Sequence, residues 1–258
     1  MSQWIDYIKF HFQSVNAHGL HSPFMYQLAT RCFYDKKKYP EYKKLKNYHK
    51  QLLNNKDFIT VNDLGAGSKK MKNNRRQIRQ IARIAGSSYK EMKLLFRLSK
   101  YFQPQRILEL GTSLGKSAYA LSLGHQNASI ITVEGDENLA RLSSMYLQHN
   151  KVDNVNLIQQ NFDDFLETLN DNSQLFDLIF IDGNHRYKPT IQYFNKLITH
   201  IHNDTLIIID DIYWNDEMKQ AWQELIKHPV VRQSVDTFHF GMLFFRKEQF
   251  KQDFKIRI

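Results

Sequence analysis

Two apolar runs that each end in carboxylates constrain this chain most. They are Phe176-Asp-Leu-Ile-Phe-Ile-Asp182 and Thr205-Leu-Ile-Ile-Ile-Asp210-Asp211. Continuous runs rich in Ile and Leu are typical of strands covered on both faces, as in a parallel sheet. Ligands of open α/β sheets bind beyond the carboxyl ends of the strands. We therefore expect Asp182, Asp210 and Asp211 to meet at one edge of a sheet.

Three carboxylates in one crevice repel each other unless a positive charge lies between them. A divalent cation is the simplest such charge, because hard cations prefer oxygen ligands. The sequence therefore predicts a divalent-cation site at Asp182, Asp210 and Asp211. The alternative is that one or two of these residues only cap the helices that follow.

Apolar patterns of strand and helix alternate through the second half of the chain. A capping box at Ser88-Tyr-Lys-Glu91 opens a helix. The remaining expected elements are strands at 106–110, 129–134 and 155–158, helices at 116–123, 138–149, 163–169, 188–200 and 217–227, and two strands around Gly241 within 234–246. Repeated βα units predict a doubly wound, mostly parallel sheet with helices on both faces. The final pair predicts an antiparallel hairpin at its edge.

The positive charge is concentrated before this sheet begins. Of the net +10, residues 1–100 hold 21 Lys/Arg and 6 Asp/Glu, a net of +15, and the remainder holds 15 and 20, a net of −5. The densest clusters are Lys36-Lys-Lys38 with Lys43, Lys44 and Lys46, and then Lys69, Lys70, Lys72, Arg75, Arg76 and Arg79. Mixed with tyrosines, they suit a polyanion such as RNA. The alternative is a solvated basic surface, or one that docks on the acidic half.

Residues 58–68 imitate a nucleotide-binding strand and glycine turn. The acid expected about 20 residues further on, at the end of a second strand, is absent. We therefore expect a flexible basic loop here, which could close over a ligand.

Composition excludes several other classes of protein. The chain has no apolar run long enough to span a membrane, and its first residues lack a basic region followed by an apolar core. The single Cys32 excludes an internal disulfide and a cysteine-based zinc cluster. We expect a cytoplasmic protein without membrane contact.

A second glycine turn follows the first strand of the alternating region. Glu109-Leu-Gly111-Thr-Ser-Leu-Gly115-Lys-Ser117 combines a sharp turn at Gly111 with a close approach of the backbone to a ligand at Gly115. The next strand ends at Glu134, 23 residues after Gly111. An acid there can accept both hydroxyls of a ribose. The third glycine of the dinucleotide fingerprint is missing, which disfavours pyrophosphate binding.

Over residues 88–246 the chain resembles the class I S-adenosylmethionine-dependent methyltransferases, closest to the cation-dependent catechol and caffeoyl-CoA type O-methyltransferases. The resemblance implies a Rossmann-like, seven-stranded sheet. It also implies that the methionine end of the cofactor is held by Gly111, Thr112, Ser113 and Ser117, the ribose by Glu134, and the adenine by Asn161 and Phe162, with Glu109, Gly115 and Asp182 completing the cofactor contacts. Asp182, Asp210 and Asp211 match the family's metal ligands.

Two residues depart from the family pattern. Asp211 stands where the family usually has Asn, which adds negative charge. His185 stands where the family has a lysine general base. Because imidazole titrates near neutral pH, His185 can take a hydroxyl proton, and we assign it with Asp182 to catalysis. The alternatives are that His185 contacts the metal or the cofactor, or is a structural turn residue. Trp214 either stacks on a planar acceptor or packs its loop.

The function expected from this pattern is cation-dependent O-methylation of a small hydroxylated acceptor. One alternative is O-methylation of a hydroxylated nucleoside in tRNA through the basic segment. An alternative of another class is a non-catalytic nucleotide- or RNA-binding module. We expect residues 1–87 to form a basic, mainly helical segment and residues 88–258 the methyltransferase domain, and we leave a homodimer open.

Overall fold

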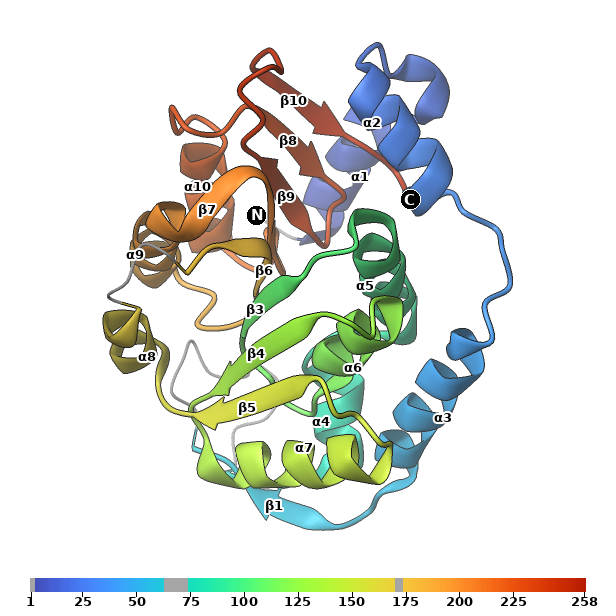
Figure 1. The fold of residues 1–258 in the computed structure, drawn as a ribbon, viewed down its shortest axis with the longest axis vertical. Coiled ribbons are helices and arrows are strands. Elements are labelled where there is room, and N and C mark those ends of the chain that lie inside the picture. The colour runs from blue at the N-terminus through green and yellow to red at the C-terminus, as the bar shows by residue number, and fades with distance from the viewer. Residues whose placement is uncertain (1–2, 63–73, 170–173) are drawn as a thin grey trace. The chain divides into compact units, whose positions relative to one another are not determined.

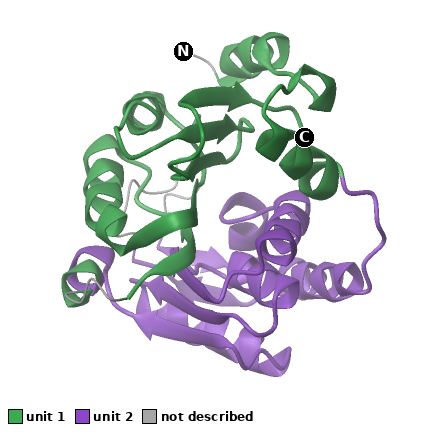
Figure 2. Cartoon of the chain, turned by 45° about the horizontal axis from the view of Figure 1, so that its top comes forward, with its two compact units in different colours: residues 1–34, 166–258 green, residues 35–165 purple. Residues whose placement is uncertain are grey.

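The computed structural model describes residues 3–62, 74–169 and 174–258. The chain forms two compact units, Met1–Tyr34 with Leu166–Ile258, and Asp35–Phe165 (Figure 2). The fold is α/β and Rossmann-like with a mostly parallel central sheet, as the alternating pattern predicts. None of the described helices is both long and apolar enough to cross a membrane.

The unit of residues 35–165 contains three parallel strands in the order β3-β4-β5 (Figure 1). Their bounds are Arg106–Leu110, Ser129–Glu134 and Val155–Gln159. The helices of the unit are α3 (Glu41–Asn54), α4 (Ile78–Ile84), α5 (Tyr89–Phe102), α6 (Lys116–Gly124) and α7 (Glu137–His149), and α8 (Phe162–Thr168) begins in it. The predicted strands of this region are confirmed to within one residue.

The capping box at the start of α5 is also confirmed. The Ser88 hydroxyl accepts from the Glu91 N–H, and the Glu91 carboxylate accepts from the Ser88 N–H. Two orphan N–H groups of the first turn are thereby satisfied.

Residues 58–60 differ from the loop predicted there. Phe58–Thr60 form strand β1, which pairs antiparallel with β2 (Arg75–Gln77). Phe58, Ile59 and Thr60 are all residue types that favour strands. The basic residues that follow them in the sequence led to the prediction of a loop. The glycine turn and the lysines Lys69, Lys70 and Lys72 of the predicted basic loop lie outside the described residues.

The other unit contains the strands in the order β10-β8-β9-β7-β6. Strands β6 (Phe176–Ile181) and β7 (Ile201–Ile209) are parallel, and β9 (Gly241–Phe244) runs antiparallel to both β7 and β8 (Gln233–Asp236). Strand β10 (Gln252–Lys255) is parallel to β8. The helices are α1 (Gln3–Gln13), α2 (Pro23–Leu28), α9 (Tyr187–Leu197) and α10 (Asp216–Leu225), with a π-helical turn at Ala29–Phe33 and 3-10 turns at Ala17–Gly19 and Ile198–His200.

The predicted C-terminal hairpin exists, but its turn lies at residues 237–240 and not at Gly241. Gly241 is the first residue of β9, and a β-carbon there would lie 2.5 Å from the Trp222 ring. The glycine is therefore required by the close approach of α10 to the strand and not by a turn.

The two ends of the chain are joined within this unit. Val15 forms a parallel bridge with Ile256, and the Tyr34 hydroxyl donates to the Arg257 carbonyl at 2.6 Å. Residues 3–34 therefore group with the C-terminal strands, whereas residues 35–62 and 74–87 belong to the other unit. The domain boundary expected at residue 88 stays a prediction.

Ser88→Ala should lower the free energy of unfolding by about 1 kcal/mol, because it removes the cap of α5. Urea unfolding measures the change. Ser144→Ala, inside α7, is the matched control and should leave stability unchanged or slightly raised, since alanine favours a helix interior. Equal stability of the Ser88 variant and the wild type would contradict the role of the cap.

Candidate active site

The glycine loop begins where β3 ends and is fixed to the end of β4. The N–H groups of Gly111 and Thr112 both donate to the Val133 carbonyl, at 2.9 and 3.2 Å. Two donors on one carbonyl hold the first turn of the loop against the neighbouring strand.

Glu134 contacts this loop directly. Its carboxylate accepts from the Ser113 N–H at 2.8 Å and from the Asp136 N–H at 3.0 Å. Burial raises the pKa of Glu134 above its usual value, and the two N–H donors oppose that shift. The acid predicted to bind ribose and the loop predicted to hold methionine are therefore neighbours.

A buried chain of hydroxyls links Glu109 to the loop. The Thr132 hydroxyl donates to the Glu109 carboxylate, and the hydroxyls of Thr112 and Thr132 are 2.6 Å apart. Since Thr132 has one hydroxyl proton, Thr112 must donate to Thr132. Glu109 is fully buried, so it acts on the loop through these two threonines. A direct contact of Glu109 with the cofactor stays a prediction, as does that of the nearly buried Ser117.

Gly115 is required by its backbone conformation and by a neighbouring side chain, and its approach to a ligand stays a prediction. It is the N-cap of α6 with φ +68°, and a β-carbon there would lie 2.8 Å from the Tyr48 hydroxyl. That hydroxyl donates to the Leu114 carbonyl at 2.9 Å. The space beside Gly115 is thus occupied by a tyrosine of α3, which sequence reasoning did not single out.

Lys116 is a second residue that sequence reasoning missed. Although it is a lysine, only 2% of its surface is exposed, and its ammonium donates to the carbonyls of Ala82, Ala85 and Gly86 at 3.0–3.2 Å. These carbonyls end α4, where a cation is favoured by the helix dipole. The only signal in the sequence is a lone lysine two residues before the apolar run 118–121, at the start of α6.

Asn161 and Phe162, the predicted adenine contacts, stand at the start of α8. The Asn161 side chain accepts from the Asp164 N–H at 2.8 Å, which makes it a helix cap. Phe162 is half-buried as the first residue of the helix. Their contact with adenine stays a prediction.

The acid-tipped strands β6 and β7 pair in register in the other unit. Ile181 pairs with Ile209, and the Asp210 N–H donates to the Ile181 carbonyl at 2.9 Å. Asp182 and Asp210 therefore follow paired residues on neighbouring strands. Asp210 is nearly buried, and its carboxylate accepts from the Asp211 N–H at 2.8 Å.

Asp211 has left-handed backbone geometry, with φ +54°. Aspartate and asparagine tolerate this conformation better than other residues with a β-carbon. The backbone therefore accounts for an Asp at a position where the resembling family has Asn.

His185 lies in the turn after β6. Its Nε2 is 3.7 Å from the Asp182 carboxylate, and its ring centre is 6.3 Å from that of Trp214. The Asn215 side chain donates to the His185 carbonyl at 2.9 Å and caps α10, which ties the two loops together. Burial lowers the pKa of His185 below its usual value, and the Asp182 carboxylate opposes that shift.

Asp182, Asp210 and Asp211 are not the N-cap residues of the following helices, which was the alternative role expected for one or two of them. The N-cap positions are Arg186 for α9 and Asn215 for α10. Three carboxylates are a suitable donor set for Mg²⁺ or Mn²⁺. In the described part of the chain, however, no three His, Cys, Asp or Glu side chains form a group that could hold a metal ion.

Comparison with known proteins gives the class of the fold. Residues 108–212, less than half of the chain, match the family model of a methyltransferase domain. No protein of curated function matches the chain in sequence. Among solved structures, the S-adenosylhomocysteine-bound methyltransferase PaMTH1 of Podospora anserina is 17% identical with a TM-score of 0.62, over 88% of this chain and 97% of that one.

Two further structures are O-methyltransferases. TomG of Streptomyces achromogenes, involved in tomaymycin synthesis and solved with S-adenosylmethionine, is 18% identical with a TM-score of 0.57, over 81% of this chain and 91% of that one. The Bacillus cereus enzyme, solved with S-adenosylhomocysteine, is 18% identical with a TM-score of 0.57, over 86% and 96%.

The expected class I methyltransferase resemblance is confirmed. The fold is similar to the folds of these solved O-methyltransferases. The match to a methyltransferase domain over residues 108–212 runs from β3 to the loop after β7.

Lys116→Met should lower the free energy of unfolding by about 2–3 kcal/mol, because three buried carbonyls lose a charged donor. Urea unfolding of the variant and the wild type checks this. Lys90→Met, at an exposed position of α5, is the control and should change stability by less than about 0.5 kcal/mol. A Lys116 variant as stable as the control would show that the buried cation does not stabilise the fold.

Proposed function

We propose that the protein is an S-adenosylmethionine-dependent O-methyltransferase that uses a divalent cation and a small hydroxylated acceptor. The observation that carries the proposal is the contact between the Glu134 carboxylate and the Ser113 N–H. It joins a glycine turn and an acid at the end of the next strand, the pair needed for the methionine and ribose ends of this cofactor. The methyltransferase domain match over residues 108–212 supports it.

When bound, the cofactor supplies an electrophilic sulfonium methyl group and the cation supplies Lewis acidity toward the acceptor oxygen. The chain supplies the base. Because burial favours the uncharged imidazole, His185 is able to accept the hydroxyl proton at neutral pH. The nearby Asp182 carboxylate stabilises the imidazolium that results. Trp214, beside the His185 ring, offers an apolar face to a planar acceptor.

The proposed cation would be held by Asp182, Asp210 and Asp211. Support comes from their carboxylate oxygens, which are suitable ligands, and from the register of β6 and β7. Because Ile181 pairs with Ile209, Asp182 and Asp210 follow at equivalent positions on neighbouring strands. Neighbouring strands lie about 4.8 Å apart, a spacing that two ligands of one ion can bridge.

The activity is tested by release of S-adenosylhomocysteine from labelled cofactor with pools of small metabolites. A chelator should abolish turnover, and added Mg²⁺ or Mn²⁺ should restore it. Asp210→Ala and Asp211→Ala should each reduce turnover by about 100-fold or more while cofactor affinity stays nearly unchanged, and Asp182→Ala, at a residue that is also a predicted cofactor contact, should reduce turnover by at least as much. Asp177→Ala, at the opposite end of β6, is the matched control with normal turnover.

Turnover that survives chelation would refute the requirement for a divalent cation. A protein that binds the cofactor in calorimetry but releases no product with any acceptor pool would support the non-catalytic binding module instead.

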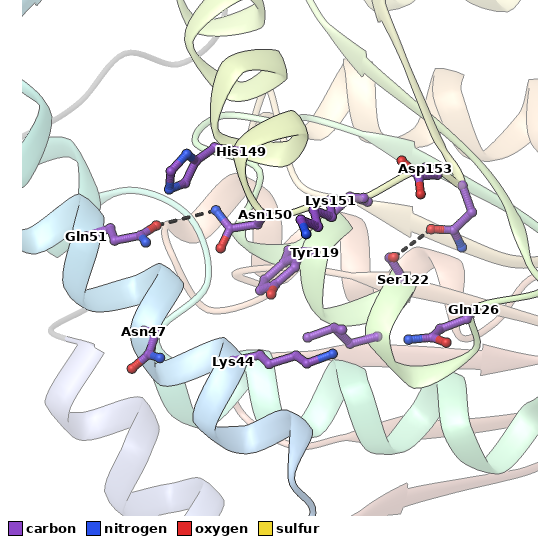
Figure 3. A pocket seen from close by; sticks show the side chains of 13 residues that line it. Lys44, Asn47, Gln51, Tyr119, Ser122, Gln126, His149, Asn150, Lys151 and Asp153 are labelled. Atoms are coloured by element: carbon purple, nitrogen blue, oxygen red, sulfur yellow. Dashed lines mark hydrogen bonds between the residues drawn. The ribbon is translucent and has the colours of Figure 1, made fainter.

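A second candidate acceptor is a hydroxylated nucleoside in RNA. The observation that favours it is the outer face of α3, where Lys43, Lys44, Lys46 and Lys50 are exposed while Leu45, Tyr48 and Leu52 are buried. Lys44 also borders a hollow of about 510 Å³ with Lys151 and amide side chains from α3 and the end of α7 (Figure 3). Lysines and amides are suited to phosphates and ribose hydroxyls.

If the acceptor is RNA, tRNA binding should weaken steeply between 50 and 200 mM salt, by about 10-fold or more, as phosphate contacts are lost. Replacing Lys44, Lys46 and Lys50 by Gln should lower the salt slope by roughly one per contact removed. Fluorescence anisotropy measures both. Lys188, Lys227 and Lys247, exposed in the other unit, give a control variant with the same charge change. Salt-insensitive or absent binding would exclude this candidate.

A further inference from the structure

We infer that Tyr48 is a positioning residue for the cofactor loop, although it lies outside the methyltransferase domain of residues 108–212. The inference rests on the proposed function, because the loop at Gly111–Gly115 is taken there as the cofactor loop. Tyr48 belongs to α3, in the segment before the domain.

The Tyr48 hydroxyl fixes one particular peptide group. It donates to the Leu114 carbonyl at 2.9 Å, while the Gly115 N–H of the same peptide donates to the Thr112 carbonyl at 2.8 Å. Both polar ends of the peptide are therefore bonded, which sets its plane. Because Gly115 is the N-cap of α6, this plane sets the direction of the N–H groups that open the helix.

The tyrosine itself is held rigidly. It is fully buried, and its ring stacks on Tyr119 of α6 with centres 4.5 Å apart and planes 23° from parallel. A third ring, Tyr146 of α7, meets it edge-on at 6.0 Å. Burial raises the pKa of Tyr48 well above its usual range, so the phenol remains a donor.

A packing role alone would not require the hydroxyl. Phenylalanine would fill the same space and keep the ring contacts, but it would leave the Leu114 carbonyl without this donor. The hydroxyl also excludes a side chain at Gly115, whose β-carbon would lie 2.8 Å from it. Tyr48 and Gly115 therefore act as one pair, and the conformation of the loop depends on both.

The test is calorimetric binding of S-adenosylhomocysteine. Tyr48→Phe should weaken binding on the order of fivefold, the effect of one uncharged hydrogen bond. Tyr146→Phe is the matched control: it removes a hydroxyl from the same aromatic cluster, one bonded to Asn55 and not to the loop. It should bind as the wild type does. Both variants are measured at a temperature at which circular dichroism shows them folded.

A double-mutant cycle separates positioning from general destabilisation. Gly115→Ala should weaken binding strongly, because its β-carbon meets the hydroxyl and φ is positive. Adding Tyr48→Phe removes the atom it meets, so the double variant should bind more tightly than the sum of the two single losses predicts. Additive losses would overturn the inference.

Failure of the inference is distinguishable from failure of the proposed function. A wild type that does not bind S-adenosylhomocysteine would refute the proposed function. A wild type that binds it, with Tyr48→Phe binding equally well, would refute only the role of Tyr48.

Discussion

The end of strand β4 is the constraint on which the conformation of the glycine loop at Gly111–Gly115 depends. Its last two residues offer a carbonyl and a carboxylate, and three successive N–H groups of the loop, from Gly111 to Ser113, donate to them. The loop conformation is therefore a property of the β3–β4 pairing, whose register brings Leu110 opposite Val133. A one-residue slip of that register would separate every donor from its acceptor.

Most of the sheet could be predicted because its strands are encoded locally. Runs such as 106–110 and 176–181 are mostly apolar, and turn or capping residues bound them. Strand β7 begins at Ile201, four residues before its apolar run, because Ile201 pairs with Phe176, a pairing that hydropathy does not reveal. Residues 202–205 bulge between this pair and the next pair, Leu178 with Leu206. Strand β10 was missed for the same reason: three of its four residues are polar, and it exists only through its partner β8.

The acidic residues and glycines of the candidate site were predicted from the sequence, but the side chains that hold them in place were not. Gly111, Glu134 and Asp182 follow apolar strands, so their position is readable from the sequence. Tyr48 and Lys116 depend on contacts between segments 30 to 66 residues apart, for which a single sequence carries no periodic signal. The division of the N-terminal residues between two units also depends on long-range contacts, such as Val15 with Ile256.

Helix α3 has two faces with unrelated partners. Its buried face carries the tyrosine that holds the loop peptide, and its exposed face carries four lysines. A helix is stiff over 14 residues, so an anion that displaces one face also displaces the other. If a polyanion shifts α3 at all, thermodynamic reciprocity requires that it and the cofactor change each other's affinity by the same factor. The affinity of the α3 lysines for a polyanion would then depend on whether the cofactor is bound.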